Sequence, residues 1–129
     1  MILVDTGVWI DYFHGFDPEV TGLLRDHQVV IHPMVIAELA TGSIRQRRQV
    51  LADLATLRVA PMLSHSELMA FIETRVLWGK GVGVIDIHLL GSCLLEAGLE
   101  LHTRDKPLVK MARQLGVLYL PGDAAHHQA

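Results

Sequence analysis

Short β-rich apolar runs alternate along the chain with longer segments of helical periodicity, and this alternation restricts the fold more than any other feature of the sequence. Strands that alternate with helices form α/β folds, in which right-handed crossovers favour parallel strands. We therefore predict an α/β sandwich with a mainly parallel sheet. We expect strands at residues 2–4, 29–31, 57–60, 99–102 and 117–120, and helices at 8–13, 20–25, 33–41, 45–57, 64–78, 85–97 and 107–115.

Length and composition set the wider limits. The 129 residues, half of them hydrophobic, suit one compact domain, which we expect over residues 1–121 with a flexible tail over 122–129. One cysteine excludes an internal disulfide and favours the reducing cytoplasm. The first ten residues lack the basic region of a signal peptide, and no apolar run is long enough for a membrane span. The net charge of -3 is weak evidence about partners.

Acidic side chains are rare in the segments that this fold should bury. Three such segments contain one acid each: Asp5 within residues 1–10, Glu38 within 29–40 and Asp86 within 81–95. A buried carboxylate without a partner is costly, so it is usually neutralised, paired or bound to a metal. Three of them in one small chain call for a shared explanation.

Each acid also has a purely structural interpretation. Asp5 and Asp105 could cap the helices that follow them. Glu38 could lie on a solvated helix face, and Asp86 could stabilise the N-terminus of its helix by charge. Ligands of parallel sheets bind outside the carboxyl ends of the strands, and Asp5, Glu38 and Asp105 all follow predicted strands. This shared position favours a common site over four unrelated structural roles.

Converging carboxylates would repel one another strongly. Two of them ~4 Å apart repel by about 4 kcal/mol at an effective dielectric near 20. Hard divalent cations relieve this repulsion, and Mg²⁺ accepts a few carboxylates together with water and phosphate oxygens. Paired ions of this kind can activate water and stabilise the leaving oxygen of a phosphodiester. The four acids therefore predict a metal-dependent nuclease.

Four segments of the chain, taken in order, resemble PIN domains, and specifically the VapC-type toxins of bacterial toxin–antitoxin pairs. The segments are ILVDTGVWID at 2–11, IAEL at 36–39, GVGVIDIHLL at 81–90 and TRDK at 103–106. Each carries one acid at the place of a family acid, and the likeness extends to about residue 120. One departure is Gly7, where the family often has serine, so a hydroxyl role at this position is in doubt.

The resemblance implies a three-layer α/β/α sandwich and an endoribonuclease that uses Mg²⁺ or Mn²⁺. It also implies RNA as substrate, inhibition by a cognate antitoxin protein, and a homodimer that is not bound to a membrane. The implied metal ligands and catalytic residues are Asp5, Glu38 and Asp86, with Asp105 completing the cluster. Thr6 and Thr103 would support these acids by hydrogen bonds.

Basic side chains near the acids are candidates for binding RNA. Lys80, Arg104, Lys106 and Lys110 could contact phosphates near the site. The alternative is that they are ordinary solvated surface residues. The glycine run 79–83 follows a predicted helix rather than a strand, which argues against a nucleotide-binding loop.

Other functions remain to be compared with the nuclease. The main alternative is a catalytically inactive PIN-like module that binds RNA or protein, although all four acids are present. A phosphoacceptor receiver domain would need an acidic pair at the first strand and an acid after the third. A haloacid-dehalogenase-type phosphatase would need a second aspartate where Gly7 stands.

Overall fold

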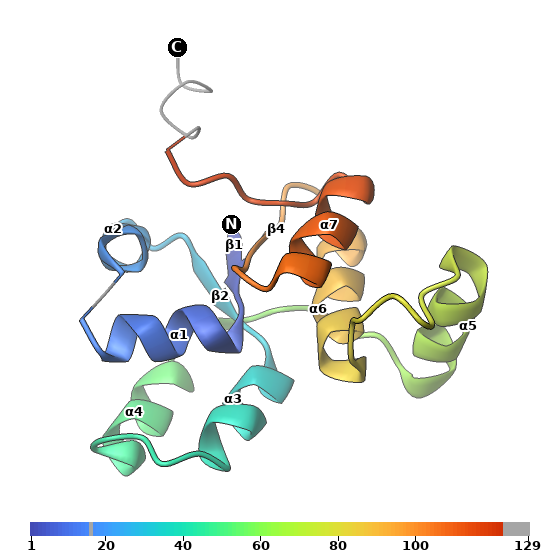
Figure 1. Ribbon diagram of the computed structural model, residues 1–129. Coiled ribbons are helices and arrows are strands. Elements are labelled where there is room, and N and C mark those ends of the chain that lie inside the picture. The colour runs from blue at the N-terminus through green and yellow to red at the C-terminus, as the bar shows by residue number, and fades with distance from the viewer. Residues whose placement is uncertain (16, 123–129) are drawn as a thin grey trace.

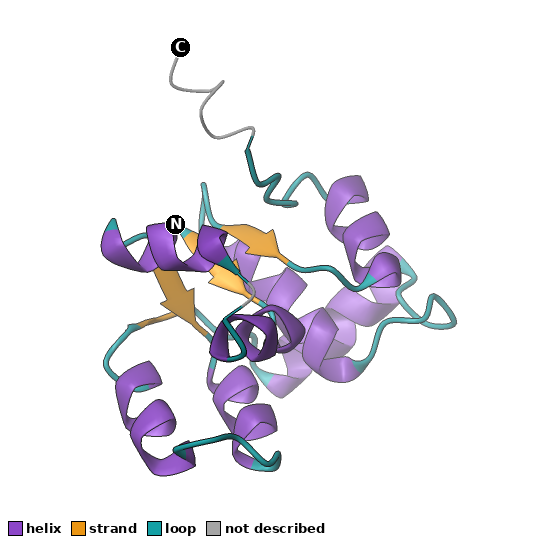
Figure 2. Cartoon of the chain, turned by 60° about the vertical axis from the view of Figure 1, so that its left-hand side comes forward, coloured by secondary structure: helices purple, strands orange, loops and turns teal. Residues whose placement is uncertain are grey.

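The computed structural model describes residues 1–15 and 17–122, and in this part of the chain helices surround a small sheet (Figures 1 and 2). The strands are β1 (Ile2–Val4), β2 (Val29–Ile31), β3 (Arg58–Val59) and β4 (Glu100–His102). The helices are α1 (Thr6–Phe13), α2 (Pro18–Arg25), α3 (Pro33–Ala40), α4 (Arg47–Leu54), α5 (His65–Arg75), α6 (Val84–Leu95) and α7 (Lys106–Gln114). The tail predicted over 122–129 lies, from residue 123 onward, outside the described residues.

The four strands are all parallel and lie in the order β3-β2-β1-β4. The first strand of the chain is therefore a central one, with Leu3 paired to Val30 on one side and to Leu101 on the other. The strand predicted at 117–120 is wrong, because the structure has only an isolated bridge between Leu101 and Leu118 there. This segment lies at the edge of the sheet, so β4 is the one strand it can pair with, and it pairs with β4 only at Leu118.

The helices form two layers around the sheet. Figure 1 shows α1 to α4 on one side of the strands and α5 to α7 on the other. Right-handed crossovers require this division, because the chain moves from β1 through β2 to β3 in one direction and returns to β4 in the other. The three-layer α/β/α fold predicted from the resemblance is confirmed.

Local sequence explains where several helices begin and end. Asp17 caps α2 by accepting a hydrogen bond from the Val20 amide at 3.0 Å, and the proline that follows suits the first helical position. Ser64 and Glu67 form a capping box at the start of α5. This helix stops at Arg75 rather than near residue 78, because Val76 adopts a left-handed backbone with φ of 54°.

The core lies on both faces of the sheet and is formed mainly by aliphatic side chains. Leu3 and Leu101 are fully buried in neighbouring strands, and Trp9 of α1 is 1% exposed. Burying a side chain of this size contributes roughly 1.5–3 kcal/mol. Within residues 1–15 and 17–122, no helix has the length and apolar character that crossing a membrane requires.

Candidate functional site

Asp5 lies at the carboxyl end of β1 and caps helix α1. It is 8% exposed, and its carboxylate accepts hydrogen bonds from the Thr6 amide at 2.8 Å and from the Thr103 hydroxyl at 2.7 Å. Burial raises the pKa of Asp5 above its ordinary value, and the charges of Asp86 and Glu38 raise it further, while the two hydrogen bonds oppose the shift. The ionised carboxylate is therefore oriented by its neighbours, but no cation among the described residues neutralises it.

Asp86 occupies the first turn of α6 and is half-buried. Its carboxylate accepts a hydrogen bond from the Gly83 amide at 3.0 Å, so it stabilises the start of the helix as the structural interpretation anticipated. Burial raises the pKa of Asp86, and the charges of Asp105 and Glu38 add to this effect. The residue thus has a capping role and also lies within the field of the other acids.

Glu38 lies on helix α3, and the expectation that it is buried is wrong. The helix turns Val35 and Leu39 into the core and leaves Glu38 exposed, because an amphipathic helix presents only one face to the sheet. The Glu38 carboxylate nevertheless accepts a hydrogen bond from the Thr6 hydroxyl. Thr6 therefore connects the end of β1 to the acid on α3.

Asp105 is exposed and caps helix α7 by accepting a hydrogen bond from the Leu108 amide at 3.1 Å. Its own amide donates to the Thr103 hydroxyl oxygen at 3.2 Å, while the same hydroxyl donates to Asp5. Thr103 therefore connects Asp5 to Asp105, the first and the last of the four candidate acids. Thr6 and Thr103 thus each donate a hydrogen bond to one of the four acids, and their supporting role at a metal site stays a prediction.

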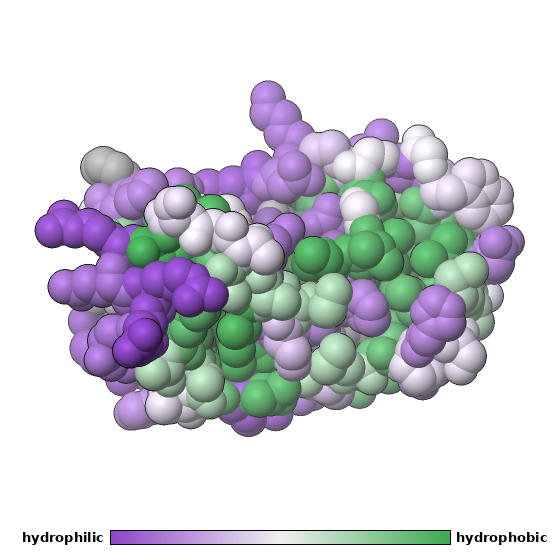
Figure 3. Space-filling model, turned by 90° about the horizontal axis from the view of Figure 1, so that it is seen from below, coloured by the Kyte–Doolittle hydropathy of each residue, from purple (hydrophilic) through white to green (hydrophobic). Residues whose placement is uncertain are grey.

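The four acids lie near the carboxyl edge of the sheet, where the charges of their neighbours raise the pKa values of Asp5 and Asp86. Figure 3 views the molecule from the side toward which the strands run, and shows smaller polar areas between two hydrophobic ones. Within the described ranges, no group of three His, Cys, Asp or Glu side chains is close enough to hold a metal ion as it stands. The donor set is nevertheless the hard oxygen type that suits Mg²⁺ or Mn²⁺.

The basic residues predicted to bind RNA separate into two groups. Lys80 and Lys110 line a hollow of about 290 Å³ together with Pro107 and Gln114, and Lys106 is exposed at the start of α7. Arg104 instead pairs with the carboxylates of Asp11 and Asp17. Neither Asp11 nor Asp17 was among the residues predicted for the site. The Asp-Pro capping pattern at residues 17 and 18 is the one local signal that could have drawn attention to the second.

Two histidines, His32 and His88, lie near the same edge of the sheet. His32 is fully buried and caps α3, with its Nδ1 accepting from the Met34 amide at 3.0 Å. The His32 and His88 rings lie 5.8 Å apart. Burial lowers the pKa of His32 to about 4, with a further contribution from His88, so the ring is neutral at physiological pH. The pair joins the helices that carry Glu38 and Asp86.

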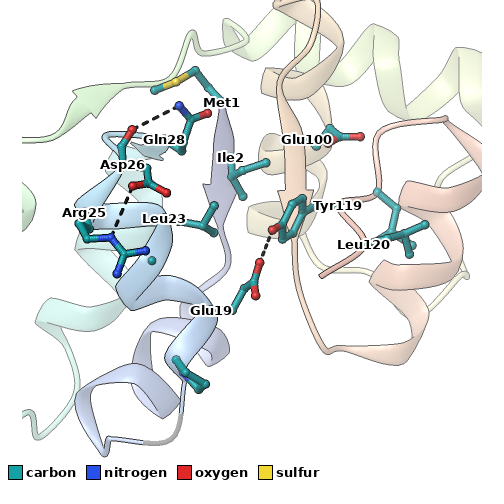
Figure 4. Close-up of a pocket in the computed structure, with 13 residues that line it drawn as sticks. Met1, Ile2, Glu19, Leu23, Arg25, Asp26, Gln28, Glu100, Tyr119 and Leu120 are labelled. Carbon is teal, nitrogen blue, oxygen red and sulfur yellow. Dashed lines mark hydrogen bonds and ion pairs between the residues drawn. The ribbon is translucent and has the colours of Figure 1, made fainter. Parts of the chain in front are cut away.

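The larger hollows lie beside this edge or away from it. One of about 730 Å³ is found at the opposite ends of the strands (Figure 4), where Tyr119 donates to Glu19 and Arg25 pairs with Asp26. Another of about 750 Å³ lies next to Glu38 and has largely apolar walls. The first contains none of the four acids, so its size alone does not make it the candidate site.

The comparisons with known proteins agree with this geometry. The family model described as the PIN domain matches residues 2–114, a range that contains all four acids. The chain belongs to the PIN domain family. Proteins named Ribonuclease VapC32, from two strains of Mycobacterium tuberculosis, are each 46% identical to this PIN domain over 117 residues. The aligned region covers 91% of this chain and 94% of each relative, which confirms the resemblance to VapC-type PIN proteins.

Proposed function

We propose that this PIN domain is a metal-dependent endoribonuclease that hydrolyses RNA phosphodiester bonds. The observation that carries the proposal is the linkage of Asp5, Glu38 and Asp105 through Thr6 and Thr103, with the charges of Glu38 and Asp105 also raising the pKa of Asp86. The relatives that are named ribonuclease align with this chain over 94% of their length. The domain itself is proposed to span residues 1–121.

The residues that would hold Mg²⁺ or Mn²⁺ are Asp5, Glu38, Asp86 and Asp105. The carboxylates stand apart in the structure, as their repulsion favours, and cation binding would draw them closer together. When bound, such ions supply an activated water and charge stabilisation for the leaving oxygen. Thr6 and Thr103 keep two of these carboxylates oriented by donating their hydroxyl protons, a supporting role that usually strengthens metal binding.

Phosphate groups of the RNA would bind next to the acids. Lys80 and Lys110 line a shared hollow near the start of α7, and Lys106 lies exposed on the same helix. An ammonium group that has no ion pair to break can bind phosphate at a lower cost than one that has. These lysines are therefore better placed for RNA than Arg104.

We also propose the partners that the VapC resemblance implies. A cognate antitoxin protein would inhibit the enzyme in the cytoplasm, and two copies of the chain would form a homodimer. The apolar hollow beside Glu38 supports the first part, because a partner bound there would lie next to one of the metal ligands.

Cleavage of RNA under metal control tests the enzyme directly. Purified protein should cut RNA in Mg²⁺ or Mn²⁺ and stop when a chelator is added. Asp5→Asn and Asp86→Asn should each lower the cleavage rate by at least ~100-fold, because each removes a charged ligand. Both variants keep a helix-capping oxygen, so circular dichroism should show an intact fold.

An inactive binding module would give a different result. It would retain RNA in a binding assay and leave it uncut under every metal condition. Undiminished cleavage by purified Asp5→Asn protein would remove that residue from the proposed site.

A further inference from the structure

Arg104 lies between two residues of the candidate site and points away to two carboxylates outside it. Its guanidinium pairs with Asp11 of α1 and with Asp17 at the start of α2. The Asp17 side chain is 1% exposed, whereas those of Arg104 and Asp11 are 46% and 45% exposed. The guanidinium therefore forms a fork that connects the loop between β4 and α7 to helix α1 and to the start of helix α2.

The buried Asp17 needs this cation. Its other polar neighbours are the Val20 amide, at 3.0 Å, and Nε2 of His102, at 3.8 Å. The His102 nitrogen is too far away for a hydrogen bond, whereas the Arg104 guanidinium contacts the Asp17 carboxylate directly, so the charge on Asp17 is balanced by Arg104. A buried carboxylate that loses its partner is strongly destabilising.

The two sequence neighbours of Arg104, Thr103 and Asp105, both belong to the candidate site. Thr103 donates its hydroxyl proton to Asp5, and Asp105 is the fourth acid. A planar guanidinium that contacts two carboxylates fixes the backbone that carries it in direction as well as in distance. Its position therefore controls how the loop presents Thr103 and Asp105.

We propose that Arg104 is a positioning residue of the metal site, and that it holds the β4–α7 loop through Asp11 and Asp17 instead of binding RNA phosphate. The proposal rests on the function proposed above. Binding phosphate would require the guanidinium to leave Asp17, which would then be buried without a cation. Phosphate binding is left to Lys80, Lys106 and Lys110.

Four variants of the full chain test this role. Arg104→Gln removes the fork, and Arg104→Lys keeps a charge that cannot reach both carboxylates at once. Arg104→Gln with Asp17→Asn also removes the buried charge and retains the helix cap. The matched control is Arg58→Gln, which breaks an exposed bidentate pair with Glu96. An exposed pair of this kind contributes little to stability.

Two measurements separate positioning from RNA binding. The first is the Mn²⁺ concentration that gives half of the maximal rise in melting temperature. The second is the slope of the RNA-binding constant against salt without metal, which falls by about 0.7 for each phosphate group of a single strand that the protein ceases to bind. A residue that only stabilises the fold would leave both unchanged.

We expect Arg104→Gln to lower the melting temperature by roughly 10 °C and to raise the Mn²⁺ midpoint by ~10-fold or more. Arg104→Lys should also weaken Mn²⁺ binding, and it provides the comparison if the glutamine variant does not fold. The double variant should recover most of the stability, because the unpaired buried charge is gone, but its Mn²⁺ midpoint should stay raised by ~10-fold, because the fork is still absent. The salt slope should stay at its wild-type value throughout, and Arg58→Gln should resemble the wild type in both measurements.

A salt slope that falls in the folded double variant would overturn the proposal and make Arg104 an RNA ligand. Wild-type Mn²⁺ midpoints in folded Arg104→Gln and Arg104→Lys would overturn it as well. If the wild-type chain itself gains no stability from Mn²⁺, the proposed metal site and the role of Arg104 are both wrong. If Mn²⁺ raises the melting temperature of the wild type and of the Arg104 variants equally, only the inference about Arg104 is wrong.

Discussion

At the scale of single residues, the environment of Asp5 opposes the charge that its proposed role requires. The carboxyl is 8% exposed, and two other acids influence its pKa. The hydrogen bonds from Thr6 and Thr103 recover part of the stability of the charged form. Such an environment makes the metal-free protein less stable but leaves the Asp5 carboxylate ready to bind a cation. Carboxylates with perturbed pKa values are often found at functional sites.

The first prediction concerns Asp5→Asn in metal-free protein. The pKa of Asp5 is raised from its ordinary value of 3.8, so the folded chain binds this proton more tightly than the unfolded chain. Stability is therefore lost as the pH rises through the interval from 3.8 to the raised pKa. We expect the variant to melt at or above the wild-type temperature at pH 7 in the presence of chelator, and to lose this advantage in acid.

The control is Asp53→Asn, which makes the same charge change at an exposed position on α4, where Asp53 accepts from Gln49. It should leave both the melting temperature and RNA cleavage close to wild type. An Asp5→Asn protein that melts many degrees lower at pH 7 would contradict the account of a strained carboxylate.

The acids were predictable from the sequence at this scale, but not all of their surroundings. Asp5, Glu38 and Asp86 stand out because each is the only acid in its apolar segment, and Asp105 stands out by its position after the fourth predicted strand. The partners of Arg104 could not be found in this way. Its pairs with Asp11 and Asp17 join positions that are 93 and 87 residues apart, and no local pattern encodes contacts of that range.

At the scale of elements, helix α6 places Asp86 and is packed tightly against the segment before α5. The Ser92 hydroxyl donates to the Pro61 carbonyl at 2.5 Å. A Cβ at Gly91 would lie 2.2 Å from Cδ1 and 2.8 Å from Cγ of Leu63. The glycine therefore allows a contact that any larger residue would push apart.

The second prediction is that Gly91→Ala destabilises the protein by about 1–3 kcal/mol, because overpacking a close contact displaces both sides. Thermal or denaturant unfolding would measure the change. The loss should be smaller when Leu63→Ala is present as well, since the space is then available. The control is Gly7→Ala in helix α1, where nothing lies within 4 Å of the new Cβ, and which should gain roughly 0.5–1 kcal/mol from helix propensity. Equal effects of the two substitutions would contradict the packing argument.

The elements themselves were predictable where pattern and pairing agree. The runs at β1 and β2 are short and apolar, the run at β4 alternates apolar with polar residues, and each is followed by a polar residue and became a strand. The segment after α7 has a similar composition but only the edge of the sheet to pair with, so Leu118 forms a single bridge. The early end of α5 depends on the left-handed backbone of Val76, a conformation that is rare for a β-branched residue and therefore not suggested by its type.

At the scale of the whole molecule, metal binding and folding should be coupled. A ligand that binds only the folded state at one hundred times its dissociation constant stabilises it by about 2.7 kcal/mol. We expect millimolar Mg²⁺ or Mn²⁺ to raise the melting temperature of the wild-type protein by several degrees. Asp86→Asn should lose most of this gain, whereas Asp53→Asn should keep it. An unchanged wild-type melting curve would argue against a metal site in the folded chain.

The hydrogen bond from Thr103 to Asp5 joins residues that are 98 positions apart, and this separation has a consequence during translation. Any ribonuclease is made on RNA, so an enzyme that matured early would threaten the message being translated. In this chain Asp5 is made first, and the proposed metal site is incomplete until the loop after β4 has been made. With the proposed ligand set, the unfinished polypeptide would be harmless to its own template, and a product that ends before residue 103 would be inert however well it folded.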